Sequence, residues 1–438
     1  MVEAGRVEQK RVELMGRLGV HFARVEPFTQ AGKYVRGLLS DLPRKNCWTL
    51  AEYAGDGTPD RMQRLVERAS WDTMAAMGTV RDFVAEHLAD GDGRAVLVLD
   101  ESGDEKTGTA TCGVKRQYVG CAGKVANAVN FVNATYSTGR GHALIGSRLY
   151  IPAEQLGDDA GRTGMGIPAD LEFKTKPQLG GDLLTDALDA GVPVHWCTAD
   201  AVYGRDRALR ETCEQRGVGY SLGVPCSFKI RLPSGTSVRA DATLRFLTAR
   251  AWQVASCGPG SKGERRYAFA WLATTSDRHF LLIRRSLSKP AELAYFYCYV
   301  PEHIPATLGV LVAVTGRRWT IEEDHEFGKD QFGFDQSQVR RYTPIMRHIV
   351  LVIAALAVCV VAAADARTRA RPLPTPTSPT QPPPADIGLI PLTVVEIKKL
   401  FNLASPVWRS ISHYLHWSWW RRRHQARARW YHHRARLT

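Results

Sequence analysis

One stretch of sequence, residues 349–364, limits what this chain can fold into more than any other, because it contains only apolar residues. Such a segment requires either a lipid bilayer or the interior of a protein. It is 16 residues long, whereas a helix needs about 20 apolar residues to span a bilayer. Arg347 and His348 precede it directly. We therefore expect a buried core helix and no association with a membrane.

The 438 residues are sufficient for two or three domains, and the 44% hydrophobic content is ample for their cores. The formal net charge of +14 favours a polyanionic partner, nucleic acid before a membrane surface. The nine cysteines include no C-x-x-C pair, which is typical of reduced cytoplasmic thiols and speaks against a structural zinc site.

The N-terminal segment, residues 1–90, is predicted to be helical. Residues 48–54 favour one short helix, which the glycines of residues 55–57 end. Thr58 is the expected N-cap of the next helix, with Pro59 at its first position. Two helices joined by a glycine turn are found in DNA-reading modules and equally in other helical bundles. Both interpretations remain open.

Two apolar segments each lead to an aspartate. Residues 94–100 and 192–200 have the composition of buried strands and end on Asp100 and Asp200. We expect an acidic, glycine-containing turn after the first of them. Strands followed by alternating helices and strands predict a mixed α/β sheet covered by helices.

A third acid lies in residues 317–329, which favour a helix. At about 100° per residue, Arg318, Glu322 and Lys329 fall on one face. A solvated helix face with an Arg–Glu pair explains this pattern by itself. Together with Asp100 and Asp200, however, Glu322 completes a set of carboxylates suited to two divalent cations acting on phosphodiesters.

Residues 226–309 are rich in strand-like segments and in arginine, and we expect a β-rich insertion here. Trp252 and its neighbouring aromatics lie among these cations, a combination that suits contact with a DNA backbone and stacking on bases. The alternative is that the aromatic side chains form the core of the insertion. The basic residues are Arg231, Arg239, Arg245, Arg250, Lys262, Arg265 and Arg266.

Residues 371–384 are rich in proline and predict an exposed, stiff tether. Thr393 and Glu396 form a capping-box pattern at the start of an amphipathic helix. Beyond Ser405 the chain has arginines and large aromatics but no acid. We expect this tail to contact nucleic acid rather than a membrane surface. The expected contact residues are Arg421, Arg422, Arg423, Arg427 and Arg429.

The three carboxylates resemble the DDE site of cut-and-paste transposases. Arg318, Glu322 and Lys329 match the R-x-x-x-E-x-x-x-x-x-x-K signature of the insertion-sequence 4-like group. One position departs from that group, since Thr315 stands where many members have a tyrosine. Further segments are similar to the insertion-sequence 701 family of bacterial transposases: residues 99–104, 106–108, 116–120, 199–204, 333–340 and 420–429.

This resemblance implies an RNase H-like mixed sheet with helices, interrupted by the β-rich insertion and flanked by an N-terminal helical domain and the basic C-terminal helical tail. The expected parts are a DNA-binding domain (1–90), a catalytic domain (91–225 and 310–366), the insertion (226–309), a Pro-rich linker (367–392) and the tail (393–438).

The resemblance also implies two Mg²⁺ ions, for which Mn²⁺ can substitute, held by Asp100, Asp200 and Glu322, with Arg318 and Lys329 on neighbouring phosphates. The implied partner is double-stranded DNA, both the terminal inverted repeats and the target, bound by a dimer on paired ends in the bacterial cytoplasm at the nucleoid. Two other functions remain open: a DNA-binding regulator derived from a transposase, and a structure-specific nuclease that uses the same core.

Overall fold

The computed structural model describes residues 2–119, 123–260, 263–274, 276–370, 373–374, 377–378 and 380–437. It consists of two compact units, the first formed by Met1–Val80 with Phe327–Thr438 and the second by Arg81–Glu326. The boundaries fall inside two helices, α5 (Thr73–Leu88) and α12 (Trp319–Phe332). The four segments expected to form separate N-terminal, catalytic, linker and tail parts are thus grouped differently, because residues 1–80 share a unit with the C-terminal helices.

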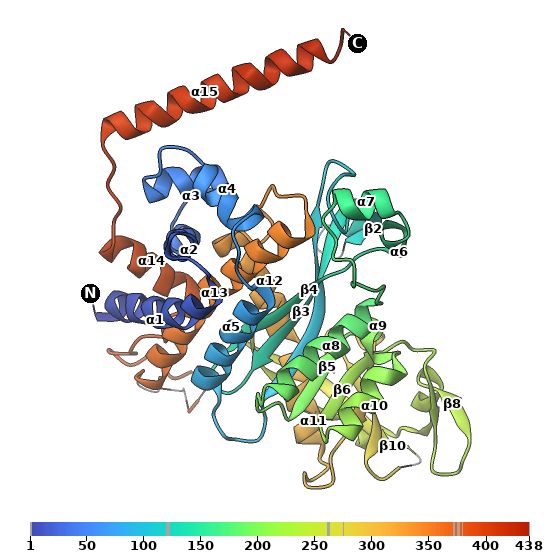
Figure 1. Ribbon diagram of the computed structural model, residues 1–438. Helices are drawn as coiled ribbons and strands as arrows, with labels where there is room; N and C mark the ends of the chain where they lie inside the picture. The colour runs from blue at the N-terminus through green and yellow to red at the C-terminus, as the bar shows by residue number, and fades with distance from the viewer. Residues whose placement is uncertain are drawn as a thin grey trace. The chain divides into compact units, whose positions relative to one another are not determined.

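The second unit contains the mixed sheet that the sequence predicts (Figure 1). Its strands are β1 (Val96–Glu105), β2 (Lys115–Val119), β3 (Lys124–Ser137), β4 (His142–Leu149), β5 (Trp196–Ala199), β6 (Gly219–Val224), β9 (Gln253–Gly260), β10 (Gly263–Ala273), β11 (His279–Arg285) and β12 (Leu293–Tyr299). Strand β3 pairs antiparallel with β1, and β5 and β6 continue the sheet in parallel register. The mixed α/β, RNase H-like prediction is confirmed.

The helices of this unit are α6 (Ala153–Leu156), α7 (Asp159–Gly164), α8 (Lys176–Asp189), α9 (Ala201–Gly204), α10 (Arg207–Gln215) and α11 (Leu308–Arg317). Neighbouring residues of β6 show how they cover the sheet. Ser221 hydrogen-bonds Thr315 of α11 at 2.7 Å, while Leu222 faces α9. Because successive side chains of a strand point to opposite faces, α11 and α9 lie on opposite faces of the sheet.

One prediction about β1 is wrong. The strand does not end at Asp100 but continues to Glu105, where a turn was expected. The parallel pairing with β5 stops at Leu99, whereas the antiparallel pairing with β3 persists to Glu105 opposite Ala128. The long partner strand β3 therefore holds the acidic segment extended. Asp200, in contrast, directly follows β5 as predicted.

The β-rich segment after residue 226 extends the same sheet. Strand β12 pairs with β6, and β11, β10 and β9 follow outward. Only β7 (Lys229–Arg231) and β8 (Ser237–Arg239) form a separate hairpin. Two short 3-10 helices, η3 (Asp241–Phe246) and η4 (Ala249–Ala251), connect this hairpin to β9. Lys262, one of the basic residues of this segment, lies outside the described residues, as does Gly120 of the segment 116–120.

The first unit is helical and is built around α13 (Tyr342–Thr368). The other helices that lie wholly within it are α1 (Val2–Leu18), α2 (Val25–Leu39), α3 (Cys47–Ala54), α4 (Asp60–Glu67), α14 (Val394–Ala404) and α15 (Ile411–Arg434), and η1 (Gly19–His21) follows α1. Helix α13 contacts α1, α2, α4 and α14. It is long and apolar enough to cross a membrane, but 89% of its apolar window is buried inside this unit. The predicted core helix is confirmed, although it is longer than the apolar run.

The polar residues that precede the apolar run are buried as well, which explains how the helix extends beyond it. Arg347 donates to the carbonyl oxygens of Val66 and Trp71, both at 3.2 Å. His348 lies between the Tyr34 hydroxyl at 2.9 Å and the Gly333 carbonyl at 3.0 Å. Each buried polar group thus has partners, as burial requires.

Helix α3 forms as predicted. Asn46 caps its N-terminus, and Gly55 ends it with φ at 82°, a conformation that glycine adopts without strain. The predicted cap of α4 is wrong by one residue, because Pro59 occupies the N-cap position and Asp60 begins the helix. Thr58 instead donates its hydroxyl hydrogen to the Asp60 carboxylate at 2.8 Å.

Candidate active site

Asp100 and Asp200 come together because their strands are neighbours. Leu99 of β1 is the register partner of Ala199 of β5, so each aspartate follows a paired residue at the same level of the sheet. The Asp200 carboxylate accepts a hydrogen bond from the Val202 backbone at 2.8 Å and thereby caps α9. Two acids that are distant in sequence therefore meet at the carboxyl end of β5.

Glu322 joins them through Arg318. Arg318 ends α11, and Glu322 lies in the first turn of α12. The Arg318 guanidinium donates to the Glu322 carboxylate at 2.5 Å and lies 3.7 Å from the Asp100 carboxylate. The predicted i,i+4 pair therefore forms, and the same arginine also links the helix to the sheet. Two of the predicted acids, Asp100 and Glu322, thus lie within 4 Å of this cation, and its charge also acts to lower the pKa of Asp200, against the effect of burial.

Burial and nearby negative charge raise the pKa values of Asp100 and Asp200. Burial raises the pKa of Asp100 to about 7, with the nearby Asp200 and Glu101 acting in the same direction and Arg318 opposing them. Burial also raises the pKa of Asp200, again against the effect of Arg318. Acids with raised pKa values that share a cleft are typical of functional sites. Such a group is suited to binding further positive charge.

Glu101 is adjacent to Asp100 but faces the other side of the sheet. It accepts hydrogen bonds from Lys176 of α8 at 2.9 Å and from the Tyr203 hydroxyl at 3.2 Å. Asp100, on the opposite face, has Asn133 of β3 as its register partner. Asn133 in turn contacts His325 of α12 at 3.1 Å. The alternation along β1 thus separates the candidate ligand Asp100 from Glu101, which pairs with α8 and α9 on the other face.

A second cluster fixes the helix that carries Glu322. Asp324 is fully buried and accepts a hydrogen bond from Thr135 at 2.7 Å. The Nδ1 atom of His142 lies 2.9 Å from the same carboxylate. Burial alone lowers the pKa of His142, but Asp324 and Glu323 outweigh it and raise that pKa to about 9. The sequence analysis missed His142 and Thr135, because neither belongs to a motif and only the fold places them beside α12.

Thr315, which departs from the insertion-sequence 4-like pattern, is buried beneath the site. Its hydroxyl donates to the Leu311 carbonyl at 2.7 Å and contacts Ser221 at 2.7 Å. The side chain has no access to DNA, so this position supports the packing of α11 on β6.

Two other predicted contact residues lie elsewhere. Lys329 is on α12, about two turns beyond Glu322. Trp252 packs against the core of the β-rich segment, and the Arg285 guanidinium covers its ring at 3.8 Å. This packing agrees with the alternative that the aromatics of this segment are core residues. The predicted roles of both residues in DNA binding stay predictions.

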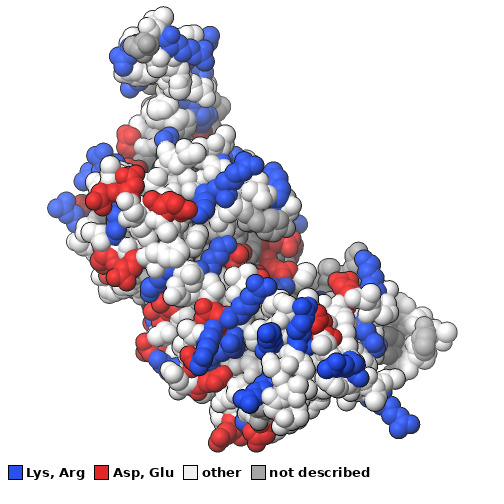
Figure 2. Space-filling model, turned by 90° about the vertical axis from the view of Figure 1, so that its right-hand side faces the viewer, with Lys and Arg blue, Asp and Glu red and all other residues white. Residues whose placement is uncertain are grey.

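The predicted tail contacts lie on α15 and fall into two groups. Arg421 forms an ion pair with Glu52 of α3. Arg422, Arg423, Arg427 and Arg429 are exposed. At the top of the view in Figure 2 several basic side chains are visible, and all basic residues of α15 other than histidine are arginines. Only the second half of the tail therefore offers its charge freely to a partner.

Comparison with known proteins identifies the family of the chain. A family model described as DDE superfamily endonuclease matches residues 17–244, and one described as transposase DDE domain matches residues 175–358. The chain is 24% identical over 286 residues to a probable transposase for insertion sequence element IS701 from Microchaete diplosiphon, covering 61% of this chain and 70% of that protein.

Among solved structures, the chain is similar to a piggyBac transposase synaptic complex with hairpin DNA. The TM-score is 0.43 and the identity 10%, over 93% of this chain and 80% of that one. The first family model alone matches more than half of the chain. The chain therefore belongs to the DDE superfamily of endonucleases and carries a transposase DDE domain.

Proposed function

We propose that this protein cleaves DNA at the ends of a mobile element and joins the freed ends to target DNA. The observation that carries the proposal is that Arg318 lies against both Asp100 and Glu322, while Asp200 follows the strand residue paired with Leu99. A structural role alone does not require three acids in the neighbourhood of one cation. The match to a transposase DDE domain points to the same activity.

Members of this family normally use divalent metal ions, and the donor set here fits them. Asp100, Asp200 and Glu322 would hold two Mg²⁺ ions, with Mn²⁺ able to substitute. Hard oxygen donors suit these cations, and two neighbouring acids with raised pKa values gain by exchanging protons for metal charge. When bound, a pair of such ions activates the attacking oxygen and stabilises the leaving oxygen at phosphorus.

The side chains around the acids then position the DNA. In the first step, water attacks the phosphodiester at the element's end, the bond to the 3′ oxygen breaks, and a 3′-hydroxyl is left. In the second step the oxygen of this hydroxyl attacks a target phosphodiester and forms a new P–O bond, while the bond to the target's own 3′ oxygen breaks and leaves a 3′-hydroxyl. Arg318 and Lys329 are proposed to hold neighbouring phosphates, as guanidinium and ammonium groups do well. Glu101, bound by Lys176 and Tyr203, keeps β1 and α8 in place beside Asp100.

The partner is double-stranded DNA, both the terminal inverted repeats and the target. Pairing of two ends before joining suggests a dimer, and the bacterial cytoplasm at the nucleoid is the expected location. Exposed arginines of α15 supply charge for this substrate.

The test is cleavage and joining by purified protein on a plasmid that carries the element's own ends, with Mg²⁺. Asp100→Asn, Asp200→Asn and Glu322→Gln should each remove cleavage and leave DNA affinity largely unchanged, because the cations elsewhere provide that affinity. Asp189→Asn is the matched control, since this exposed acid pairs only with Arg216 on the surface. Calorimetry of Mg²⁺ binding gives an independent readout. The heat of binding should be reduced in the three variants and unchanged in the control.

The outcomes separate the alternatives. DNA binding by the wild type without any Mg²⁺-dependent nicking would favour the regulator. Cleavage without joining of a 3′-hydroxyl end to a second duplex would favour the nuclease. Full activity of all three acid variants would show that Asp100, Asp200 and Glu322 do not form the active site.

A further inference from the structure

The helical unit contains a basic groove that the catalytic site does not use. It lies between α2 and α4, has a volume of about 790 Å³, and is lined by cations of both helices and of the residues beside them. Those cations are Arg24, Lys33, Arg61, Arg64 and Arg68. Glu26 is the acid in the same lining. We call this feature the α2–α4 groove.

Helix α4 places three of these cations in one row. Met62, Leu65 and Val66 are buried against the unit's core. Arg61 and Arg64 lie on the opposite, exposed face of the helix, and Arg68 follows at its C-terminal end. At 1.5 Å per residue the row is about 10 Å long. This length corresponds to about three nucleotide steps of one DNA strand, each of which rises by about 3.4 Å along the duplex axis.

The structure shows no ion pair for the three arginines among the residues that it describes. Within the part of the chain that the structure describes, no ion pair or side-chain hydrogen bond involves Arg61, Arg64 or Arg68. By comparison, Lys33 on the other wall pairs with Asp56 at 2.6 Å. Three like charges within about 10 Å of helix repel one another and contribute nothing to folding. An external anion is the partner that they lack.

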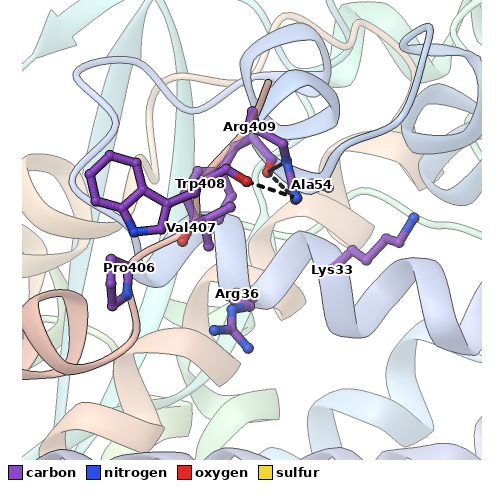
Figure 3. A pocket seen from close by; sticks show the side chains of 8 residues that line it. Lys33, Arg36, Ala54, Pro406, Val407, Trp408 and Arg409 are labelled. Atoms are coloured by element: carbon purple, nitrogen blue, oxygen red, sulfur yellow. Dashed lines mark hydrogen bonds between the residues drawn. The ribbon is translucent and has the colours of Figure 1, made fainter. Parts of the chain in front are cut away.

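The basic surface continues beyond the groove along α2. Lys33 also lines a second cavity of about 360 Å³, together with Arg36 of α2 and Arg409 (Figure 3). Arg409 is held there by hydrogen bonds to the Tyr53 carbonyl oxygen at 2.8 and 3.2 Å. The two cavities share Lys33, so the cations of the second cavity lie next to the groove, although Tyr53 and Trp408 line this second cavity as well.

We propose that the α2–α4 groove, with Arg61, Arg64 and Arg68 at its centre, binds the sugar-phosphate backbone of a DNA duplex. The inference rests on the proposed function, which supplies DNA as the substrate. All residues that line the α2–α4 groove are described, and none has an aromatic ring. The groove therefore lacks the stacking platforms that single strands use, and backbone contact is what its side chains allow.

The experiment measures binding of a fluorescein-labelled duplex of about 30 base pairs and arbitrary sequence, in EDTA, as a function of salt. Each phosphate contact contributes about 0.9 to the slope of log K against log salt. The triple variant Arg61→Gln, Arg64→Gln, Arg68→Gln should therefore lower the slope by about 2 to 3. The matched control is Lys115→Gln, Arg207→Gln, Arg216→Gln, which removes three surface cations already paired with carboxylates.

The control should keep the wild-type slope, and a triple Arg→Lys variant at 61, 64 and 68 should largely retain it. Equal melting temperatures of the Gln and Lys variants show that the fold is intact. A wild-type salt slope in the Gln variant would contradict DNA binding by the α2–α4 groove. It would leave the proposed function unaffected, because cleavage is assayed separately. An equal loss of salt slope in the control variant would also contradict DNA binding by the groove, because the net charge of the protein would then explain the effect. A wild type that binds no duplex overturns both proposals, and binding of an acidic peptide in its place would identify a protein partner.

Discussion

The Arg318 guanidinium lies 3.7 Å from the Asp100 carboxylate, although the two residues belong to different elements of the fold. After burial, which raises the pKa of Asp100, this arginine has the largest influence on that acid, and it acts in the opposite direction. The arginine of the signature therefore has a role inside the protein in addition to any role on DNA: it keeps Asp100 able to ionise near neutral pH.

Removing that charge should raise the pKa of Asp100 above its value of about 7. We expect Arg318→Gln to move the acid limb of the pH–rate profile for cleavage to higher pH, because the deprotonated carboxylate is the ligand form. With Arg318→Lys, the acid limb of the profile should lie close to its wild-type pH, because the positive charge is retained. If Arg318 served only to hold a phosphate, the variant would lower the rate equally at every pH.

His142 should make stability depend on pH. Its pKa is raised to about 9 in the folded state, against about 6.5 in an unfolded chain. A raised pKa means that the folded protein binds the proton more tightly, so this stabilisation is fully present below about pH 6.5 and is lost as the pH rises through about 9.

The measurement is the melting temperature of the wild type and of His142→Asn at several pH values. The difference between the two should be largest near pH 6 and should shrink toward pH 9. His303→Asn, a change at an exposed histidine, serves as the control. A difference that stays constant with pH would show that His142 acts by packing alone.

The C-terminal helix should be separable into a structural and a DNA-binding half. Trp417 is fully buried and donates to the Asp56 carbonyl at 2.8 Å. His413 and His416 lie 2.8 Å from the carbonyl oxygens of Glu52 and Gly57. These partners satisfy carbonyl groups at and just beyond the end of α3, which a helix cannot pair internally.

A chain that ends at residue 421 should therefore largely keep its melting temperature, because it retains Trp417 and loses only the ring contact of His424 with Trp48 among the described contacts to α3. It should lose several units of salt slope in DNA binding, because the deleted residues include six arginines. A chain that ends at residue 407 should in addition melt at a lower temperature. Trp417→Ala should reproduce this loss of stability, roughly 3–5 kcal/mol as for other buried aromatics. An unchanged salt slope in the first truncation would mean that α15 serves only to hold α3.

At Gly204 the short helix α9 lies too close to β6 to accommodate a side chain. A Cβ atom at Gly204 would lie 1.9 Å from the Gly223 carbonyl oxygen of β6. Because this oxygen belongs to the backbone of a central strand, α9 must move instead, and Asp200 caps that helix. We expect Gly204→Ala to cost about 1–3 kcal/mol of stability and to abolish cleavage, with DNA binding retained.

Gly181→Ala is the matched control, because a Cβ atom at this position on α8 meets nothing within 4 Å. It should leave both stability and cleavage near the wild-type level, since alanine favours a helix over glycine. Normal cleavage by Gly204→Ala would show that the loop carrying Asp200 tolerates displacement.

Local patterns in the sequence determined much of this protein. Apolar runs identified the strands that lead to Asp100 and Asp200, and helical spacing identified the Arg318–Glu322 pair. Proline, glycine and capping residues located the ends of α3 and the start of α14, where Thr393 accepts a hydrogen bond from the Glu396 backbone. These features depend on residues a few positions apart, and one sequence contains all the information they need.

Only the tertiary structure decided which side chains meet. Pairing with β3 carried β1 past Asp100, and the alternation of that strand turned Glu101 toward Lys176 and away from Arg318. Burial of Trp417 divided a tail that is uniformly basic in sequence into a packed half and an exposed half. Such outcomes depend on contacts between residues tens to hundreds of positions apart, and a local pattern does not record which of its faces the fold will cover.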